Sequence, residues 1–252
     1  MTNRYFIKLS FIGANYHGWQ TQENANSVQS NLNEALSVII KEKITTTGAG
    51  RTDAGVHARE FFAHFDTIQH LNETQRKELI LHLNGFLPSD IGIHEIFQVR
   101  PDAHARFSAV SRSYQYIIVQ TKDPFLFGFA YHYSVPLDIQ KMNEGATIIK
   151  SCSDFTSFAK LPCDTKTNIC HITDIFWVKK KNQLFFTITS DRFLRNMVRA
   201  IVGTLIDIGR GKIGLDNLKV IIEIRNRSAA GMSVPACGLY LTSIKYPPEL
   251  FN

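Results

Sequence analysis

The stretch from Gly48 to Ala58 reads Gly-Ala-Gly-Arg-Thr-Asp-Ala-Gly-Val-His-Ala, and it presents one carboxylate, Asp53, among small residues. Glycine and alanine let a loop bend sharply and let another backbone approach closely. A loop of this composition that carries one Asp beside an Arg is a candidate for a catalytic carboxylate at a cleft. The alternative is a polar turn between strands, in which Asp53 only caps the turn.

Two familiar glycine-rich loops do not fit this stretch. Gly48 and Gly50 begin like a dinucleotide-binding fingerprint, but Asp53 stands where the third glycine belongs. No Gly-Lys-Ser or Gly-Lys-Thr follows, so the loop is not the phosphate loop of nucleotide hydrolases.

The periodicity on both sides of this loop predicts alternating strands and helices. Before it, residues 5–11 alternate as a strand, and Ser27 can cap a helix with an apolar stripe formed by Val28, Leu32, Ala35, Leu36, Ile39 and Ile40. After it, we expect a strand over 61–65, a helix over 72–83 and a strand over 91–99.

The second half of the chain repeats a similar order of elements. We expect strands over 114–119, 175–178, 184–188 and 239–244, and helices over 137–149, from Asp191 towards Gly209, and over 215–224. Interspersed helices and strands with short turns favour an α+β fold with mainly antiparallel sheets. The repeated order predicts two related subdomains, residues 1–104 and 105–252.

Composition sets the broad class. The 252 residues are 44% hydrophobic and 20% charged, which is enough apolar content for one large domain or two small ones. No apolar run approaches the ~20 residues of a membrane helix, and the N-terminus enters a strand pattern and not a signal peptide, so a cytoplasmic protein is expected. The net charge of +6 suits a polyanionic partner.

The four cysteines, Cys152, Cys163, Cys170 and Cys237, form no Cys-x-x-Cys pair. Cys163, Cys170 and His171 have a spacing that fits no common zinc template. We therefore expect ordinary thiols in a reducing compartment and no metal.

The sequence resembles the tRNA pseudouridine synthase A family over nearly its whole length. The run Gly50-Arg51-Thr52-Asp53-Ala54-Gly55-Val56-His57 is similar to the catalytic motif of that family. Further segments match in the same order: 16–20, 27–29, 104–109, 112–116, 154–158, 197–199 with 201–203, and 238–241.

This resemblance implies a fold and an activity. The fold would be two ferredoxin-like halves with mainly antiparallel sheets that run together and meet at a central basic cleft. The activity would be that of an isomerase that converts uridine to pseudouridine at positions 38–40 of tRNA, on the 3′ side of the anticodon stem-loop. The reaction involves no redox step and requires no cofactor, and the family commonly forms homodimers whose tRNA spans both subunits.

The resemblance also implies three catalytic residues. Asp53 would be the essential carboxylate, Arg199 would keep it charged and oriented, and Tyr114 would contact the target base. The alternatives are structural, because an arginine stripe is often a solvated helix face and a strand tyrosine often packs into a core. Tyr116 shares the face of Tyr114 and is expected to pack.

Further residues are candidates for binding the RNA substrate. Arg51 could hold a backbone phosphate or fill the gap left by an extruded base. His57 could bind phosphate or simply finish the turn. The remaining candidates would contact phosphates by charge: Arg106, Arg112, Arg192, Arg195 and the lysines 179–181, with Arg192, Arg195 and Arg199 expected on one face of a helix.

The sequence departs from the family pattern at two places. Glu60 and Phe61 replace a usual Gly-Gln pair, which adds negative charge and puts RNA contacts of that strand in doubt. Ala103 replaces a usual Phe before His104, which puts a packing contact in doubt but no chemistry.

Two rival functions remain. A glycosidase would need a second carboxylate near Asp53, for which Glu60 is the sole nearby candidate, and a metal-dependent hydrolase lacks a ligand cluster. An RNA-binding protein with a silent site would use the basic residues equally well, but it leaves the set of Asp53, Arg199 and Tyr114 unexplained.

Overall fold

The computed structural model describes residues 2–160 and 167–251. The chain forms two compact units. The first comprises the residues up to Val110 together with those from Leu241 onward, and the second runs from Ser111 to Tyr240. Each unit is described by itself.

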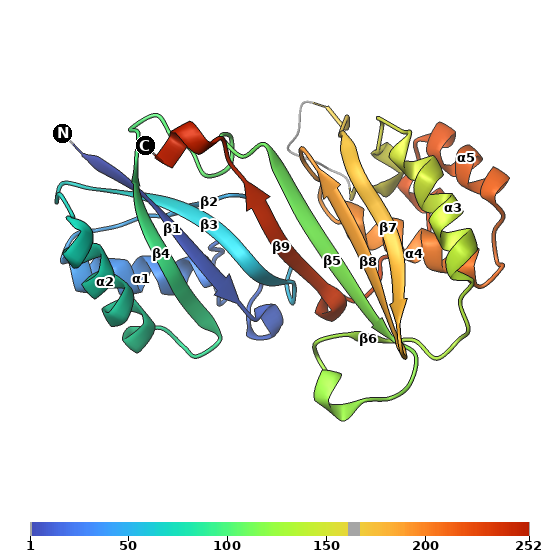
Figure 1. Ribbon diagram of the computed structural model, residues 1–252, viewed down its shortest axis with the longest axis horizontal. Coiled ribbons are helices and arrows are strands. Elements are labelled where there is room, and N and C mark those ends of the chain that lie inside the picture. Colours follow the sequence, from blue (N-terminus) through green and yellow to red (C-terminus); the bar gives the residue numbers. More distant parts are fainter. Residues whose placement is uncertain (1, 161–166, 252) are drawn as a thin grey trace. The chain divides into compact units, whose positions relative to one another are not determined.

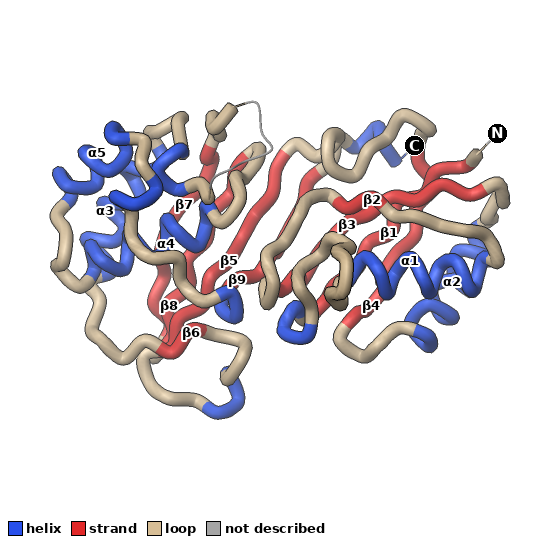
Figure 2. Tube along the Cα trace, turned by 180° about the vertical axis from the view of Figure 1, so that it is seen from behind, coloured by secondary structure: helices blue, strands red, loops and turns tan. Residues whose placement is uncertain are grey.

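The first unit contains the strands β1 (Asn3–Phe11), β2 (Thr47–Gly48), β3 (His57–Thr67) and β4 (Ile91–Val99) and the helices α1 (Val28–Ile40) and α2 (Glu73–Phe86). The strand order is β4-β1-β3, with β2 beside β3, and all these pairs are antiparallel. Figure 2 shows α1 and α2 together, beside these strands.

Local sequence signals explain α1. Ser27 accepts a hydrogen bond from the backbone N–H of Ser30, and the Ser30 side chain closes the reciprocal contact of a capping box. The predicted apolar stripe is buried from Val28 to Ile40, except that Ile39 is half-buried. The stripe therefore positions α1, and with it the chain that leads into β2 and the Asp53 loop.

The last strand, β9 (Leu239–Lys245), explains why the end of the chain belongs to the first unit. The N–H of Val110 donates to the carbonyl of Lys245 at 2.9 Å, and the Tyr246 hydroxyl donates to the carbonyl of Ala105 at 2.6 Å. The Tyr246 ring packs edge-on against Phe6 and Phe62. The unit border thus follows Val110 instead of the expected His104, and the final segment groups with residues more than a hundred positions earlier.

The second unit contains the strands β5 (Ser111–Val119), β6 (Tyr131–His132), β7 (Ile172–Lys180) and β8 (Gln183–Ser190) and the helices α3 (Ile139–Lys150), α4 (Met197–Gly209) and α5 (Leu215–Ile224). The strand order is β5-β8-β7, antiparallel, and β6 pairs with β5 in parallel. Figure 1 shows the three helices grouped on the same side of these strands.

Short 3-10 helices complete the described secondary structure. They span Gly13–Asn15, Pro124–Leu126, Thr156–Phe158, Arg227–Ala229, Ala236–Gly238 and Pro248–Phe251. The expectation of a mixed fold with mainly antiparallel strands is confirmed. Within residues 2–160 and 167–251, no helix has the length and apolar character that crossing a membrane requires.

The prediction of a helix from Asp191 is wrong at its start. Helix α4 begins at Met197, after Asn196, whose φ of 64° places it in the left-handed region and interrupts a helical path. The Asp191 carboxylate accepts hydrogen bonds from the backbone N–H of His171 and of Arg192, at 2.8 and 2.7 Å, so it fixes a turn. Arg192 and Arg195 precede the helix, and only Arg199 lies on it.

Candidate active site

Asp53 lies in the loop between β2 and β3, and its residue is half-buried. The backbone carbonyl of Asp53 accepts a hydrogen bond from the N–H of Val56 at 3.2 Å, which closes a tight turn. The expected loop geometry is therefore present, with the carboxylate carried at its bend.

A second segment, residues 13–20, holds this loop from the side. The N–H of Gly55 donates to the carbonyl of Tyr16 at 3.3 Å, and the N–H of Trp19 donates to the Thr52 hydroxyl oxygen at 3.0 Å. These contacts hold the loop on both sides of Asp53, through the backbone of Gly55 and the side chain of Thr52, so the carboxylate is presented by a rigid support.

Glycine is required where these two segments meet. Gly18 has a φ of +90°, and a Cβ on it would lie 2.1 Å from the carbonyl oxygen of Thr52. A Cβ on Gly13 would lie 2.0 Å from the carbonyl oxygen of Val56. No side chain fits such distances, so the close approach depends on both glycines.

Aromatic packing holds residues 13–20 against β3. Trp19 is buried and packs on Phe61 of β3 with ring centroids 4.3 Å apart. The Tyr16 hydroxyl donates to the Asp90 carboxylate at 2.5 Å, and burial raises the pKa of Tyr16 so that it stays protonated. The motif residues 16–20 therefore act on Asp53 by positioning its loop.

Arg51 and His57 flank Asp53 in different environments. Arg51 is exposed, and its Nε donates to the side-chain oxygen of Gln20. His57 is buried, and its Nδ1 accepts a hydrogen bond from the N–H of Gly13 at 3.1 Å, which leaves the ring proton on Nε2. Through this hydrogen bond His57 holds residues 13–20 against the end of the loop. A contact of His57 with phosphate stays a prediction.

Tyr114 and Tyr116 both lie on β5 but differ in exposure. Tyr116 is fully buried and its hydroxyl donates to the carbonyl of Pro235 at 2.7 Å; burial raises its pKa, and the packing role expected for it is confirmed. Tyr114 is half-buried and makes an edge-on contact with Phe193, with ring centroids 5.1 Å apart. Tyr114 is thus less enclosed than Tyr116, and its expected contact with a base stays a prediction.

Arg199 lies in the first turn of α4 and is half-buried. Its Nε donates to the carbonyl of Val234 at 2.7 Å, and its own carbonyl accepts from the N–H of Val234 at 3.3 Å. This two-way contact orients the guanidinium, whose Nη atoms carry further donors. The sequence offered no signal for the Val234 contact, because it depends on a segment 35 positions away.

The other predicted RNA contacts are divided between the two units. Arg106 is exposed in the first unit. In the second unit, Arg112 donates to the backbone carbonyl of Asp191 at 2.9 Å, Arg195 is exposed and Arg192 is half-exposed. The lysines 179–181 are exposed around the turn between β7 and β8. Asp53 and Arg51 belong to the first unit and Tyr114 and Arg199 to the second, so their association stays a prediction.

Glu60, which departs from the family pattern, has a role inside the first unit. One carboxylate oxygen accepts from the N–H of Ile244 at 2.9 Å, and the other lies 3.4 Å from the Lys8 ammonium. The carboxylate thus ties β3 to the last strand, and its charge is offset locally by Lys8.

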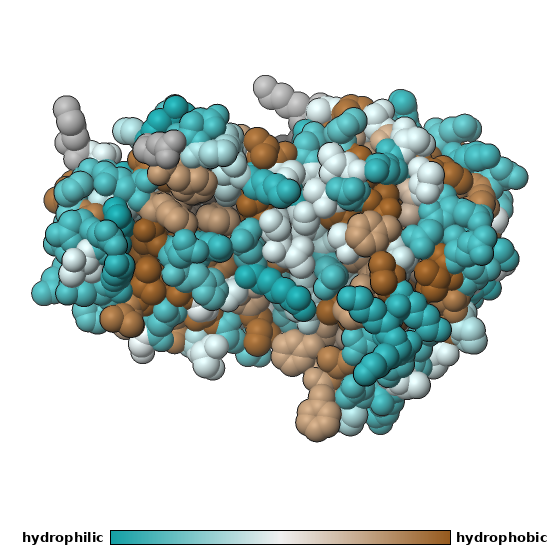
Figure 3. All heavy atoms as spheres, in the orientation of Figure 1, coloured by the Kyte–Doolittle hydropathy of each residue, from teal (hydrophilic) through white to brown (hydrophobic). Residues whose placement is uncertain are grey.

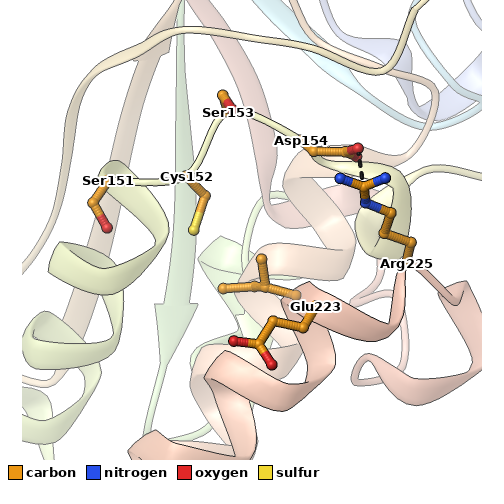
Figure 4. Close-up of a pocket in the computed structure, with 7 residues that line it drawn as sticks. Ser151, Cys152, Ser153, Asp154, Glu223 and Arg225 are labelled. Atoms are coloured by element: carbon orange, nitrogen blue, oxygen red, sulfur yellow. Dashed lines mark ion pairs between the residues drawn. The ribbon is translucent and has the colours of Figure 1, made fainter.

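A hollow of about 440 Å³ in the second unit lies away from the predicted residues. Figure 4 shows its walls, including Cys152, Glu223 and the ion pair between Asp154 and Arg225, whose atoms lie 3.1 Å apart. None of the predicted catalytic or RNA-binding residues lines it.

The cysteine expectations concern partly described residues, since Cys163 lies outside the described ranges. Cys170 is buried, and burial raises the pKa of its thiol to about 12. Among residues 2–160 and 167–251, no three His, Cys, Asp or Glu side chains are grouped as metal ligands would be.

Comparison with known proteins bears on the whole chain. A family model described as tRNA pseudouridine synthase matches residues 152–247. Proteins called tRNA pseudouridine synthase A are 48% identical in Bacteroides fragilis, over 99% of this chain and 98% of that protein, and 48% identical in Porphyromonas gingivalis, over 98% and 99%. The protein of that name from a Geobacillus species is 38% identical over 98% of this chain and 99% of its own length.

The matches to these relatives run from end to end and include the loop that carries Asp53. The chain therefore belongs to the tRNA pseudouridine synthase A family.

Proposed function

We propose that this protein isomerises uridine to pseudouridine in tRNA, on the 3′ side of the anticodon stem-loop, with Asp53 as the essential group. The observation that carries this proposal is the 48% identity to tRNA pseudouridine synthase A over 99% of the chain. The rigid glycine-dependent support of the Asp53 loop agrees with it.

The chemistry explains why one carboxylate suffices. The bond between N1 of uracil and C1′ of ribose breaks, the base turns, a bond forms between C5 and C1′, and the C5 proton is replaced by a proton at N1. No electrons are gained or lost overall, so no redox cofactor is required. An ionised carboxylate at C1′, at C6 or at a sugar proton would serve, and an ordinary Asp is ionised near neutral pH.

Arg199 and Tyr114 are assigned supporting roles in this reaction. We assign to Arg199 the task of keeping Asp53 ionised under a bound base, since burial of a carboxylate would raise its pKa. The fixed orientation of Arg199 on Val234 supports this assignment. Tyr114 would stack on the target base. The edge-on contact with Phe193 supports this assignment, because it orients the Tyr114 ring.

Substrate binding would use positive charge and shape. A base within a stem must leave the stack before Asp53 can reach C1′, and Arg51 would stabilise the opened strand. Arg106, Arg112, Arg192, Arg195 and the lysines 179–181 would contact phosphates, and His57 is retained as a weaker phosphate candidate because its ring is buried. Binding should therefore weaken steeply as salt rises.

The finer fold proposal is that both units are ferredoxin-like. With the two-residue strand β6 left aside, each unit begins with a strand that pairs with its third strand, which in turn pairs with the second: β1-β3-β2 and β5-β8-β7. A helix follows the first strand and another follows the third in both units. We further propose that the RNA binds in a basic cleft and that the protein is a cytoplasmic homodimer. Sedimentation equilibrium of the free protein tests whether it is a dimer.

The direct test is tritium release from unmodified tRNA that carries [5-³H]uridine, without added metal or cofactor. We expect release by the wild type, and a loss of about 100- to 10,000-fold in Asp53→Asn, which keeps the shape of the side chain but removes its charge. Asp123→Asn, in a loop of the second unit, is the matched control and should release normally. Unchanged release by Asp53→Asn would refute the assigned chemistry, and no release by the wild type with tRNA still bound would favour a binding protein.

A further inference from the structure

The turn from Ala103 to Ser108 exposes an aromatic ring that no part of the reaction uses. Phe107 is 75% exposed, and the adjacent Arg106 is also exposed. The guanidinium carbon of Arg106 lies 5.4 Å from the centroid of the Phe107 ring, which is a cation–π contact. An exposed aromatic ring next to an arginine is the pair of groups that single-stranded nucleic acid binds by stacking and by charge.

This ring is the outer member of a row of rings. The Phe107 and His104 ring centroids lie 4.4 Å apart, and those of His104 and His64 lie 4.7 Å apart. His64 is buried within the first unit, so the row runs from the core to the surface. Phe107 is therefore backed by other rings on one side and is open to solvent over most of its surface.

The backbone that carries Phe107 is held at each residue of the turn. The Nδ1 atom of His64 accepts from the N–H of Ala105 at 3.1 Å, and the Nδ1 atom of His104 accepts from the N–H of Arg106 at 3.1 Å and of Phe107 at 3.4 Å. The N–H of Ser108 donates to the carbonyl of His104 at 2.9 Å.

The carbonyl side of the turn is fixed as well. The Tyr246 hydroxyl donates to the carbonyl of Ala105 at 2.6 Å, and Arg4 donates to the carbonyl of Ala103 at 2.9 Å while it also binds Asp66 through two hydrogen bonds. A turn held by this many partners loses little conformational freedom when it binds a ligand. The fixed backbone thus holds the exposed Phe107 ring in one place, where a planar partner can stack on it at a low entropy cost.

We propose that Phe107 and Arg106 form a stacking site for an unpaired base of the tRNA, with Arg106 on the neighbouring phosphate. This proposal rests on tRNA being the substrate, and it adds a base contact to a residue expected to bind only through charge. The net charge of +6 and the arginine over the ring favour RNA as the occupant over an apolar protein surface.

Exposure of an aromatic residue is not by itself the argument, since other rings are exposed too. On the face drawn in Figure 3, hydrophobic residues form separate groups between hydrophilic ones. Phe125 is 92% exposed in the loop that precedes β6, and its N–H donates to Asp123, so a carboxylate and not a cation lies near its backbone. Phe125 thus serves as a control: it is also mostly exposed, but a carboxylate and not a guanidinium lies near it.

The test compares the affinity for unmodified tRNA of wild type, Phe107→Leu, Phe107→Trp and Phe125→Leu by filter binding at one salt concentration. Stacking on one base predicts that Phe107→Leu weakens binding by about 10-fold and that Phe107→Trp restores it. Phe125→Leu should bind within about two-fold of the wild type. A second measurement is the salt dependence of tRNA affinity. Arg106→Gln should reduce the magnitude of the slope of log affinity against log salt by about one, whereas Phe107→Leu should not change it.

The outcomes separate this proposal from the proposed function. If Phe107→Leu binds tRNA as the wild type does, or if Phe107→Trp is as weak as Phe107→Leu, the stacking site is refuted while tritium release by the wild type still stands. If Phe107→Leu alters self-association in sedimentation and not tRNA affinity, the ring belongs to a protein interface and the proposal fails. If the wild type neither binds tRNA nor releases tritium, the function itself is wrong, and the stacking site falls with it.

Discussion

The two units share an order of strands but differ in the connection between the second and third strands. In the second unit, β7 and β8 pair along their length, and only Lys181 and Asn182 connect them. In the first unit, β2 has two residues, Thr47 and Gly48, and eight residues separate it from β3. The long connection is the loop that carries Asp53, so the first unit has a short second strand where the second unit has a full hairpin.

This difference shows how one strand order can serve two purposes. A tight hairpin satisfies its backbone through the ladder and needs little other support. A loop in its place needs partners elsewhere. Here the Tyr16 carbonyl accepts from the N–H of Gly55, the Trp19 N–H donates to the Thr52 hydroxyl, and Gly18 permits the close approach of the two segments. The unit that carries the carboxylate therefore depends on an additional segment.

Among the variants that test this comparison of the two units, Gly18→Ala should have the largest effect, because it breaks that support. A Cβ would lie 2.1 Å from the Thr52 carbonyl oxygen, so the loop must move away from residues 16–20. We expect kcat/KM in the tritium assay to fall at least about 100-fold, because an ångström of misplacement is costly at a reacting centre. Gly128→Ala, in the second unit, has a similar φ of +80° but open space, so it isolates the backbone strain. Similar losses in both variants would contradict the role of close contact.

A smaller effect is expected from Arg199→Lys. The arginine uses Nε for the Val234 carbonyl and carries further donors on its two Nη atoms, whereas a lysine has a single ammonium nitrogen and cannot reproduce this geometry. We expect kcat to fall about 10-fold or more with little change in KM, measured by steady-state tritium release. Arg225→Lys, which changes the ion pair at the hollow of the second unit, should leave both constants unchanged. An unaltered kcat in Arg199→Lys would remove Arg199 from the mechanism.

Acid should weaken the first unit through His64. Burial first, and then the nearby Arg4 and His104 charges, lower the pKa of His64 to about 4, against an opposing effect of Asp66. The unfolded ring titrates near 6.5, so the fold is favoured above that value and loses stability as the pH falls from about 6.5 to about 4. We expect this residue alone to cost about 2 kcal/mol of unfolding free energy at pH 5 relative to pH 7.

Urea unfolding at both pH values measures this loss, and His64→Gln should show a smaller difference between them. Equal acid sensitivity of wild type and His64→Gln would rule out His64 as its source.

The smallest effect concerns the hairpin of the second unit. Lys181 has a φ of 55°, a left-handed conformation that costs most residues about 1 kcal/mol and glycine little. We expect Lys181→Gly to raise the unfolding free energy by about 0.5 kcal/mol and Lys179→Gly, in β7, to lower it. Thermal or urea unfolding distinguishes the two variants. Destabilisation by Lys181→Gly would show that the left-handed backbone of Lys181 does not reduce the stability of this hairpin.

Sequence reasoning succeeded where the signals are local. The cap of Ser27, the apolar stripe of α1 and the lysine-rich turn before β8 are each encoded within a few residues, and each lies where it was expected. The turn at Asp53 was likewise predicted, because its glycines and small residues determine the bend directly.

The remaining features depend on distant residues, which periodicity does not reveal. The start of α4 is set by Asn196, whose left-handed backbone accompanies a side-chain hydrogen bond to Ser233. The pairing of β2, the return of the last strand and the Val234 contact of Arg199 each join segments far apart in sequence. The catalytic set itself stays a prediction that combines residues of both units.

The return of the final strand has a consequence for biosynthesis. Because residues from Leu241 onward complete the unit that contains the N-terminal strand, the second unit is inserted into the first. The segment that carries Tyr246 must therefore be synthesised and leave the ribosome before Tyr246 can pack against Phe6 and Phe62. The unit made first is finished last, so a stop codon that removes the residues from Leu241 onward would damage the part of the enzyme that was translated earliest.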